Sequence, residues 1–120
     1  MITHVVIMKP RADLAPPERE ALIDAFEHAV REISVVRTVR IGRRVIHGAQ
    51  YEQTSPDAAD FLVQVDFENL ADLQAYLRHP AHEAVGAHFN RLLDSGWVYD
   101  FETGDLARLR EFAGLAVETR

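Results

Sequence analysis

A tyrosine and a histidine with spacing suited to acid–base chemistry lie in one short run of the sequence. Tyr76 precedes His82 by six residues, and His79-Pro80 lies between them. Because proline favours the first turn of a helix, we expect one helix to end before Pro80 and another to begin there. The positive end of the second helix disfavours an imidazolium at His82, so the ring would stay neutral and able to accept a proton. Tyr76 would meet it across the corner and donate a hydrogen bond to a carbonyl or enolate.

His4 is the third member of this candidate catalytic set. It shares one face of an expected strand with Val6 and Met8, and a polar ring on an apolar face needs a hydrogen-bond partner if it is buried. That partner would be Tyr76, His82 or a backbone carbonyl. We expect His4 to orient the other groups, and a structural role is the stronger expectation for it.

Simpler readings exist for the same residues. His82 would cap or pack its helix without doing chemistry, and Tyr76 would be a core-edge residue with its hydroxyl in water. The run His79-x-x-His82-Glu83 is rich in metal ligands, but its spacing is not that of zinc proteases, and His79 as an N-cap should point away from His82. We therefore expect no metal site. No phosphate-binding glycine loop, serine elbow or dinucleotide fingerprint occurs, and we expect no cofactor.

The elements that must position these residues follow from the hydrophobic periodicity. Alternating apolar residues predict strands at 2–9, 36–47, 61–67 and 97–101, and apolar residues at helical spacing predict helices at 18–33, at 70–78 after an Asn69 cap, and from Pro80 to near Gly96. Residues 48–60 form an exposed loop. This order predicts an α+β, ferredoxin-like fold, in which a four-stranded antiparallel sheet carries its helices on one face.

The other face of that sheet would be apolar in a single chain. It would expose Val5, Ile7, Ile46 and Leu62, and apolar sheet area of this kind usually marks an interface. We expect two copies to stack these faces into a homodimeric α+β barrel. Residues 1–103 form this domain, and residues 104–120 form an amphipathic helix and tail that packs over its own domain or its dimer mate.

Composition limits the functional classes. A chain of 120 residues is one domain, and a net charge of −6 argues against nucleic-acid binding, which depends on basic residues. No apolar run is long enough to span a bilayer, and no signal peptide is visible, so we expect a cytoplasmic protein without membrane partners.

Three stretches together resemble the stress-responsive A/B barrel (Dabb) family over residues 2–101. They are His4-Val5-Val6-Ile7-Met8-Lys9, Tyr76-Leu77-Arg78-His79-Pro80-Ala81-His82 and Val98-Tyr99-Asp100-Phe101. The resemblance implies a dimeric barrel. It also implies roles like those in a plant polyketide cyclase of the family, where a histidine matching His82 is the base, a tyrosine matching Tyr76 assists, and a histidine matching His4 lies in the same pocket. Two other polar pocket positions of the cyclase correspond here to Phe26 and Phe61.

The sequence favours a cofactor-independent binder, or a proton-transfer enzyme, for a small apolar carbonyl compound. Its pocket would lie between sheet and helices and be lined by Val6, Met8, Phe26, Phe61, Val63, Val65 and Phe89. One alternative is a stress-induced structural dimer whose core is simply filled. Another is a small monooxygenase or haem-binding barrel, with His82 or His88 as the haem ligand.

Overall fold

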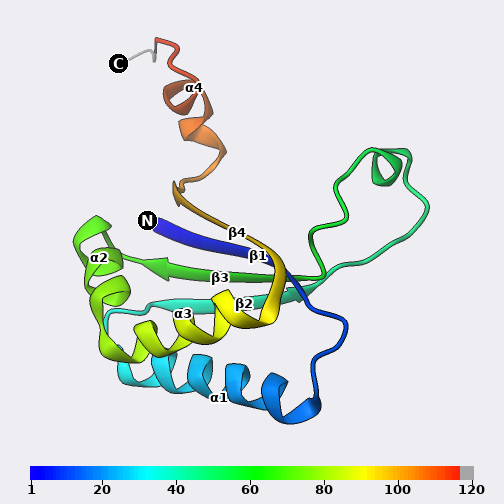
Figure 1. The fold of residues 1–120 in the computed structure, drawn as a ribbon. Coiled ribbons are helices and arrows are strands. Elements are labelled where there is room, and N and C mark those ends of the chain that lie inside the picture. Colours follow the sequence, from blue (N-terminus) through cyan, green and yellow to red (C-terminus); the bar gives the residue numbers. More distant parts are fainter. Residues whose placement is uncertain (117–120) are drawn as a thin grey trace.

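The computed structural model describes residues 1–116 and has the predicted α+β architecture (Figure 1). The antiparallel sheet has the strand order β2-β3-β1-β4, and its strands are β1 (Ile2–Pro10), β2 (Thr38–Arg43), β3 (Phe61–Phe67) and β4 (Leu93–Glu102). The three longer helices lie against one face of the sheet, and they are α1 (Pro16–Glu32), α2 (Leu70–Arg78) and α3 (Pro80–Leu92). In the described part of the chain, no helix is long and apolar enough to cross a membrane.

β1 is one of the two central strands and pairs with both β3 and β4. His4 lies opposite Val65 of β3 and Asp100 of β4, and Met8 lies opposite Phe61 and Gly96. Because directly opposed residues share a face, these side chains all point toward the helices. The side chains of Val5 and Ile7 point to the other face.

Proline and polar caps set the helix boundaries. α1 begins at Pro16-Pro17, where missing backbone N–H groups cost nothing. The Asn69 side chain accepts a 2.9 Å hydrogen bond from the Asp72 N–H and so starts α2, as predicted. His79 ends α2 and caps α3, because its Nδ1 accepts the Ala81 N–H at 3.0 Å.

The filled part of the core lies at one end of the helix–sheet layer. Its buried members are Ala29, Ile33, Val65, Phe67, Leu73, Tyr76 and Ala81. They come from the end of α1 and its C-cap, from β3, from α2 and from the start of α3. The opposite end of the layer, near Met8 and Phe61, contributes nothing to this cluster.

The predicted second strand, residues 36–47, is too long at both ends, because β2 spans Thr38–Arg43. β2 ends at Arg43 rather than at residue 47, because β3 begins at Phe61, which pairs with Arg43, and leaves no partner strand beyond. Ile46 therefore lies in the projecting segment 44–60 and not on the sheet face where we expected it. That segment contains a short 3₁₀ turn, Gln50–Gln53.

The boundary between α3 and β4 also differs from the prediction. The helix ends at Leu92, and Gly96 lies inside β4 opposite Met8. A β-carbon at Gly96 would lie 2.5 Å from Cζ of Phe89. The glycine is therefore a site of close approach between α3 and the sheet, not a helix terminus.

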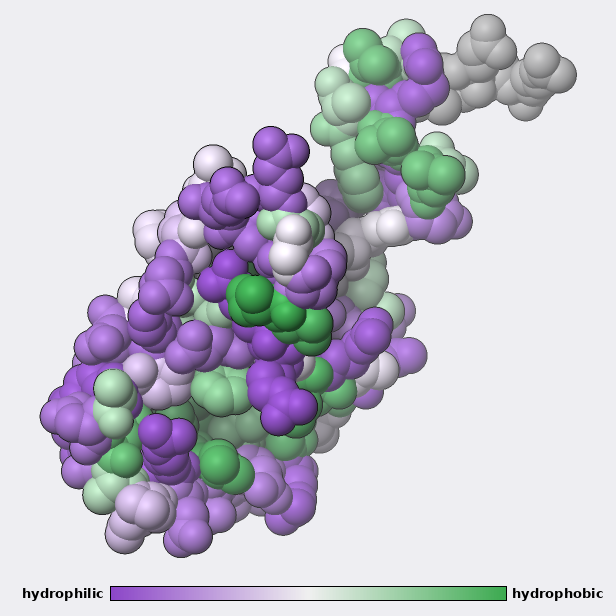
Figure 2. All heavy atoms as spheres, turned by 90° about the vertical axis from the view of Figure 1, so that its right-hand side faces the viewer, coloured by the Kyte–Doolittle hydropathy of each residue, from purple (hydrophilic) through white to green (hydrophobic). Residues whose placement is uncertain are grey.

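The C-terminal segment does not pack over its own domain, contrary to one of the two predicted arrangements. It consists of a 3₁₀ turn (Leu106–Arg108) and a single helical turn, α4 (Leu109–Phe112), and it projects beyond the sheet (Figures 1 and 2). Leu106 is 82% exposed and Leu109 is 59% exposed. Residues 117–120 of the predicted tail lie outside the described residues. We call residues 103–116 the C-terminal arm.

We expect Asn69→Ala to lower the free energy of unfolding by about 1 kcal/mol, because an N–H of the first turn of α2 loses its acceptor. Urea denaturation followed by circular dichroism measures this loss. Asn90→Ala is the matched control, since Asn90 is an exposed residue inside α3. Equal stability of the two variants would contradict the capping role.

Candidate functional site

A cavity of about 920 Å³ lies between the sheet and the helices α1 and α3. This volume is in the range of small-molecule sites. All ten residues predicted to form the site line it, namely His4, Val6, Met8, Phe26, Phe61, Val63, Val65, Tyr76, His82 and Phe89. The structure therefore brings the predicted residues together in one space. Whether they bind or catalyse stays a prediction.

Tyr76 and His82 lie side by side at the corner between α2 and α3. Their ring centroids are 4.6 Å apart, and the planes are tilted by 56°. Tyr76 is only 2% exposed and packs against Phe67 with centroids 5.0 Å apart, so its ring is fixed by the core. Within residues 1–116, no buried side-chain oxygen or nitrogen lacks a hydrogen-bond partner. His82 is half-buried beside it.

His4 completes the polar end of the cavity, but its partner is not one that we predicted. Its Nδ1 lies 2.6 Å from Oδ1 of Asp100 on β4. Since an ionised carboxylate only accepts hydrogen bonds, the Nδ1–H of His4 donates to it. The His4 ring is 5.9 Å from that of Tyr76 and 6.3 Å from that of His82. Asp100 thus orients a buried histidine at the edge of the Tyr76–His82 pair.

The protonation states at this corner suit a donor and an acceptor. Burial raises the pKa of Tyr76 to about 12, so the phenol keeps its proton and can donate a hydrogen bond. Burial, and then repulsion from His4, lower the pKa of His82 below its ordinary value of 6.5. His82 is therefore neutral at pH 7 and able to accept a proton.

His79 takes no part in this cluster, because its Nδ1 is occupied by the Ala81 N–H. Among residues 1–116, no three His, Cys, Asp or Glu side chains gather in a group that would hold a metal ion.

Sequence reasoning missed four polar groups in or beside the cavity. Asp100 appeared in a recognised motif, but only the register between β1 and β4 places it beside His4. Arg19, Glu27 and Arg43 line the cavity itself. The helical spacing of Arg19 to Leu22 and Phe26, three and seven residues later, was a usable signal for the first arginine.

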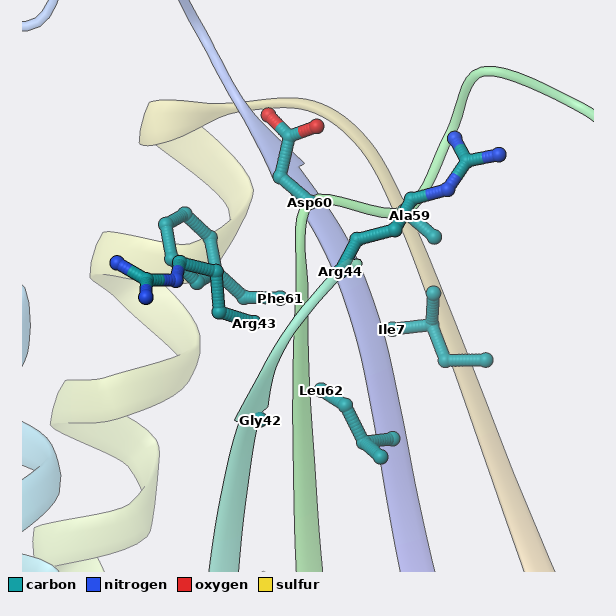
Figure 3. Close-up of a pocket in the computed structure, with 8 residues that line it drawn as sticks. All are labelled: Ile7, Gly42, Arg43, Arg44, Ala59, Asp60, Phe61 and Leu62. Atoms are coloured by element: carbon teal, nitrogen blue, oxygen red, sulfur yellow. The ribbon is translucent and has the colours of Figure 1, made fainter. Parts of the chain in front are cut away.

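A second, smaller hollow of about 240 Å³ lies at the end of the sheet where the segment 44–60 begins (Figure 3). Ile7 and Leu62 point to one side of the sheet, whereas Phe61 and Arg43 point to the helix side. This view shows the alternation of Phe61 and Leu62 along β3 directly, and it places Arg43 on the side of the large cavity.

Comparison with known proteins assigns the family. Residues 2–103 match the stress-responsive A/B barrel domain. The chain belongs to this family. The A/B barrel match covers the sheet and the three long helices, and therefore the whole cavity.

Individual relatives of this A/B barrel chain are distant. It is 20% identical over 100 residues to olivetolic acid cyclase of Cannabis sativa, covering 83% of this chain and 94% of the cyclase. A hydroxynitrile lyase from Passiflora edulis superposes with a TM-score of 0.73 at 12% identity, covering 87% of this chain and 94% of the lyase. A dimeric ferredoxin-like protein from Bacteroides fragilis superposes with a TM-score of 0.59 at 25% identity, covering 85% and 95%.

We expect the imidazole of His82 to titrate with a pKa below 6.5 in an NMR titration of its ring protons. His4→Gln removes the charge repulsion from His4 and should therefore raise the pKa of His82. His28→Gln, on the exposed face of α1, should leave the pKa of His82 unchanged. An unchanged pKa in His4→Gln would contradict the electrostatic coupling of the two rings.

The same shift has a consequence for stability. Below pH 6.5 the unfolded chain takes up a proton that folded His82 still refuses, so the free energy of unfolding falls as the pH drops from 6.5 to the folded pKa. His82→Gln should reduce this slope when urea denaturation is repeated across that pH range, and His28→Gln should retain it.

Proposed function

We propose that this A/B barrel protein binds a small, largely apolar carbonyl compound and catalyses proton transfer at the carbon next to the carbonyl group. The observation that carries the proposal is the Tyr76–His82 pair at the end of the apolar cavity, with ring centroids 4.6 Å apart. A buried phenol that keeps its proton beside a neutral imidazole is the donor–acceptor set that enolisation needs.

The step uses only groups of this chain. The free ring nitrogen of His82 takes the proton from the carbon next to the carbonyl, and the electrons of the broken C–H bond become the enolate. The Tyr76 hydroxyl donates a hydrogen bond to the oxygen on which negative charge develops. The enolate carbon then either takes the proton back from His82 or attacks a second carbonyl of the same molecule. In the second case a ring closes in an aldol-type reaction, the electron pair of the attacked C=O bond moves to its oxygen, and that alkoxide takes the proton from His82.

The relatives support a small-molecule role. The cyclase and the lyase named above are enzymes. Phe26 and Phe61, which replace polar residues of the cyclase pattern, line the cavity and make its walls apolar. This favours an apolar ligand and supports binding more strongly than the particular cyclisation. The filled-core alternative expects no ligand-sized cavity, so a volume of about 920 Å³ counts against it.

We expect His82→Gln to lower the rate of enolisation of a bound ketone by about 10²–10⁴-fold, the usual contribution of a positioned general base. Deuterium uptake from D₂O next to the carbonyl of methyl nonyl ketone, followed by NMR, measures this rate. Tyr76→Phe should lower the rate while still binding the ketone.

The control variant is His28→Gln, which removes an exposed histidine on α1 outside the cavity lining. Deuterium uptake that is unchanged in His82→Gln, or equally reduced in His28→Gln, would contradict the proposed role of His82.

We further propose that the chain forms a homodimer through the sheet face that carries no helices. β4 presents a row of aromatic side chains there: Trp97, Tyr99 and Phe101 are each about half exposed, and successive ring centroids are 6.5 and 6.3 Å apart. The bacterial relative described as dimeric has the same fold. An unpaired apolar face of this kind is unfavourable in water.

The shape of the single chain is consistent with a partner. Its Cα radius of gyration is 16.9 Å, above the ~14 Å expected for a compact chain of this length. The C-terminal arm and the segment 44–60 both project on the side of the sheet opposite the helices, where the second copy would lie (Figure 1). We propose that the exposed Leu106, Leu109 and Phe112 of the arm pack against that copy.

We expect Tyr99→Asp to convert the dimer into a monomer, because it buries a charge in the interface. Light scattering coupled to size-exclusion chromatography measures the mass. Leu70→Asp is the control, since Leu70 is an exposed apolar residue of α2, on the helix side of the sheet and away from the proposed interface. A wild-type mass of one chain, or a Tyr99→Asp variant that stays dimeric, would contradict this interface.

A further inference from the structure

The polar groups that line the cavity are separated into two sets along its length. His4, Tyr76 and His82 form one set. Arg43 forms part of the other, because it pairs with Phe61, which in turn pairs with Met8. Met8 is four residues beyond His4 on β1, and a strand rises about 3.3 Å per residue, so the two sets are about 13 Å apart along the sheet.

The helices α1 and α3 run in opposite directions along the cavity. α3 runs from His82 to Phe89, whose ring approaches Gly96 opposite Met8. α1 runs the other way, from Arg19 near its start to the filled core at Ala29 and Ile33. Arg19 and Arg43 therefore lie toward the same end, away from the Tyr76–His82 pair.

These two arginines lack a protein counter-ion within the described residues. In residues 1–116 no carboxylate lies within 4 Å of either guanidinium, although six arginine–carboxylate contacts of this kind occur elsewhere in that part of the chain. Glu27 also lines the cavity, but its carboxylate bonds Arg31 at 2.9 Å. Of the three charged residues that line the cavity, two are therefore arginines without a bound carboxylate, and the third is a glutamate paired with Arg31.

The apolar wall between the two sets is exposed toward this end. Figure 2, which views the molecule from the side where α1 begins, shows hydrophobic surface recessed among hydrophilic side chains. Figure 3 shows the Arg43 side chain extending to the helix side of the sheet. A ligand entering here meets guanidinium groups at the rim and apolar walls beyond them.

We propose that the ligand is an elongated keto acid, whose carboxylate is bound by Arg43 and Arg19 at the rim and whose ketone, about 13 Å deeper, lies against Tyr76 and His82. This inference rests on the proposed proton transfer and adds the substrate class. A guanidinium matches a carboxylate with two parallel hydrogen bonds, so the rim selects for an acid. The length of the apolar wall selects for a chain that separates acid from ketone.

The test compares dodecanoic acid bearing a ketone at its penultimate carbon with the methyl ester of the same keto acid. Deuterium uptake next to the ketone is measured by NMR for both compounds with the full chain. We expect a KM about tenfold lower for the acid than for the ester, with similar kcat, because the rim contributes binding that does not change during the reaction.

Arg43→Gln and Arg19→Gln should each raise KM for the acid severalfold and leave the ester unchanged. Arg40→Gln is the matched control, because Arg40 lies on the same strand as Arg43, points to the opposite face of the sheet, and is outside the cavity lining. Equal KM values for acid and ester, or an Arg43→Gln variant that behaves as wild type, would overturn the inference while leaving the proton transfer in place. Absence of exchange with either compound would overturn the proposed function itself.

Discussion

The site depends on one break in the chain, at His79-Pro80. Proline cannot continue α2, so His79 takes an extended backbone conformation, and its ring accepts the first free N–H of α3. This corner sets the last turn of α2 against the first turn of α3, and with them Tyr76 against His82. A continuous helix would place residues six positions apart on different faces. The break between the helices therefore brings Tyr76 and His82, six residues apart in the sequence, into contact.

The corner also divides the helix–sheet layer into a filled half and a hollow half. Tyr76 belongs to both, because its ring packs on Phe67 in the core while its edge meets the cavity. The core around Ala29, Phe67 and Leu73 can hold the tyrosine rigidly, and a rigid donor loses little freedom when a ligand binds. At the hollow end, Gly96 lets the ring of Phe89 rest on the sheet and form part of the apolar wall.

Much of this fold could be predicted from local sequence. Helix α2 and its Asn69 cap were predicted at the observed residues, because capping and periodicity are local properties. Strand ends were predicted less well, because they depend on the partner strand. β2 stops at Arg43, where its pairing with β3 ends. The alternation of apolar residues continues to Val45 and gives no sign of this end.

In the candidate site, too, contacts between residues close in sequence could be predicted, whereas contacts between distant residues could not. The positions of Tyr76 and His82 followed from the proline, but the Asp100 partner of His4 is 96 residues away and needed the register of the sheet. The cationic rim likewise joins residues of α1 and β2 that only the folded chain brings to one end.

The proposed proton transfer requires a carbonyl compound to lie in the cavity against Tyr76 and His82. NMR of methyl nonyl ketone, labelled with ¹³C at its carbonyl, measures this directly. We predict nuclear Overhauser contacts from the ketone to His82 and Val85, and a downfield shift of the carbonyl signal that Tyr76→Phe removes. Contacts to Trp97 and Tyr99 on the open sheet face alone, with no shift of the carbonyl signal, would contradict the account.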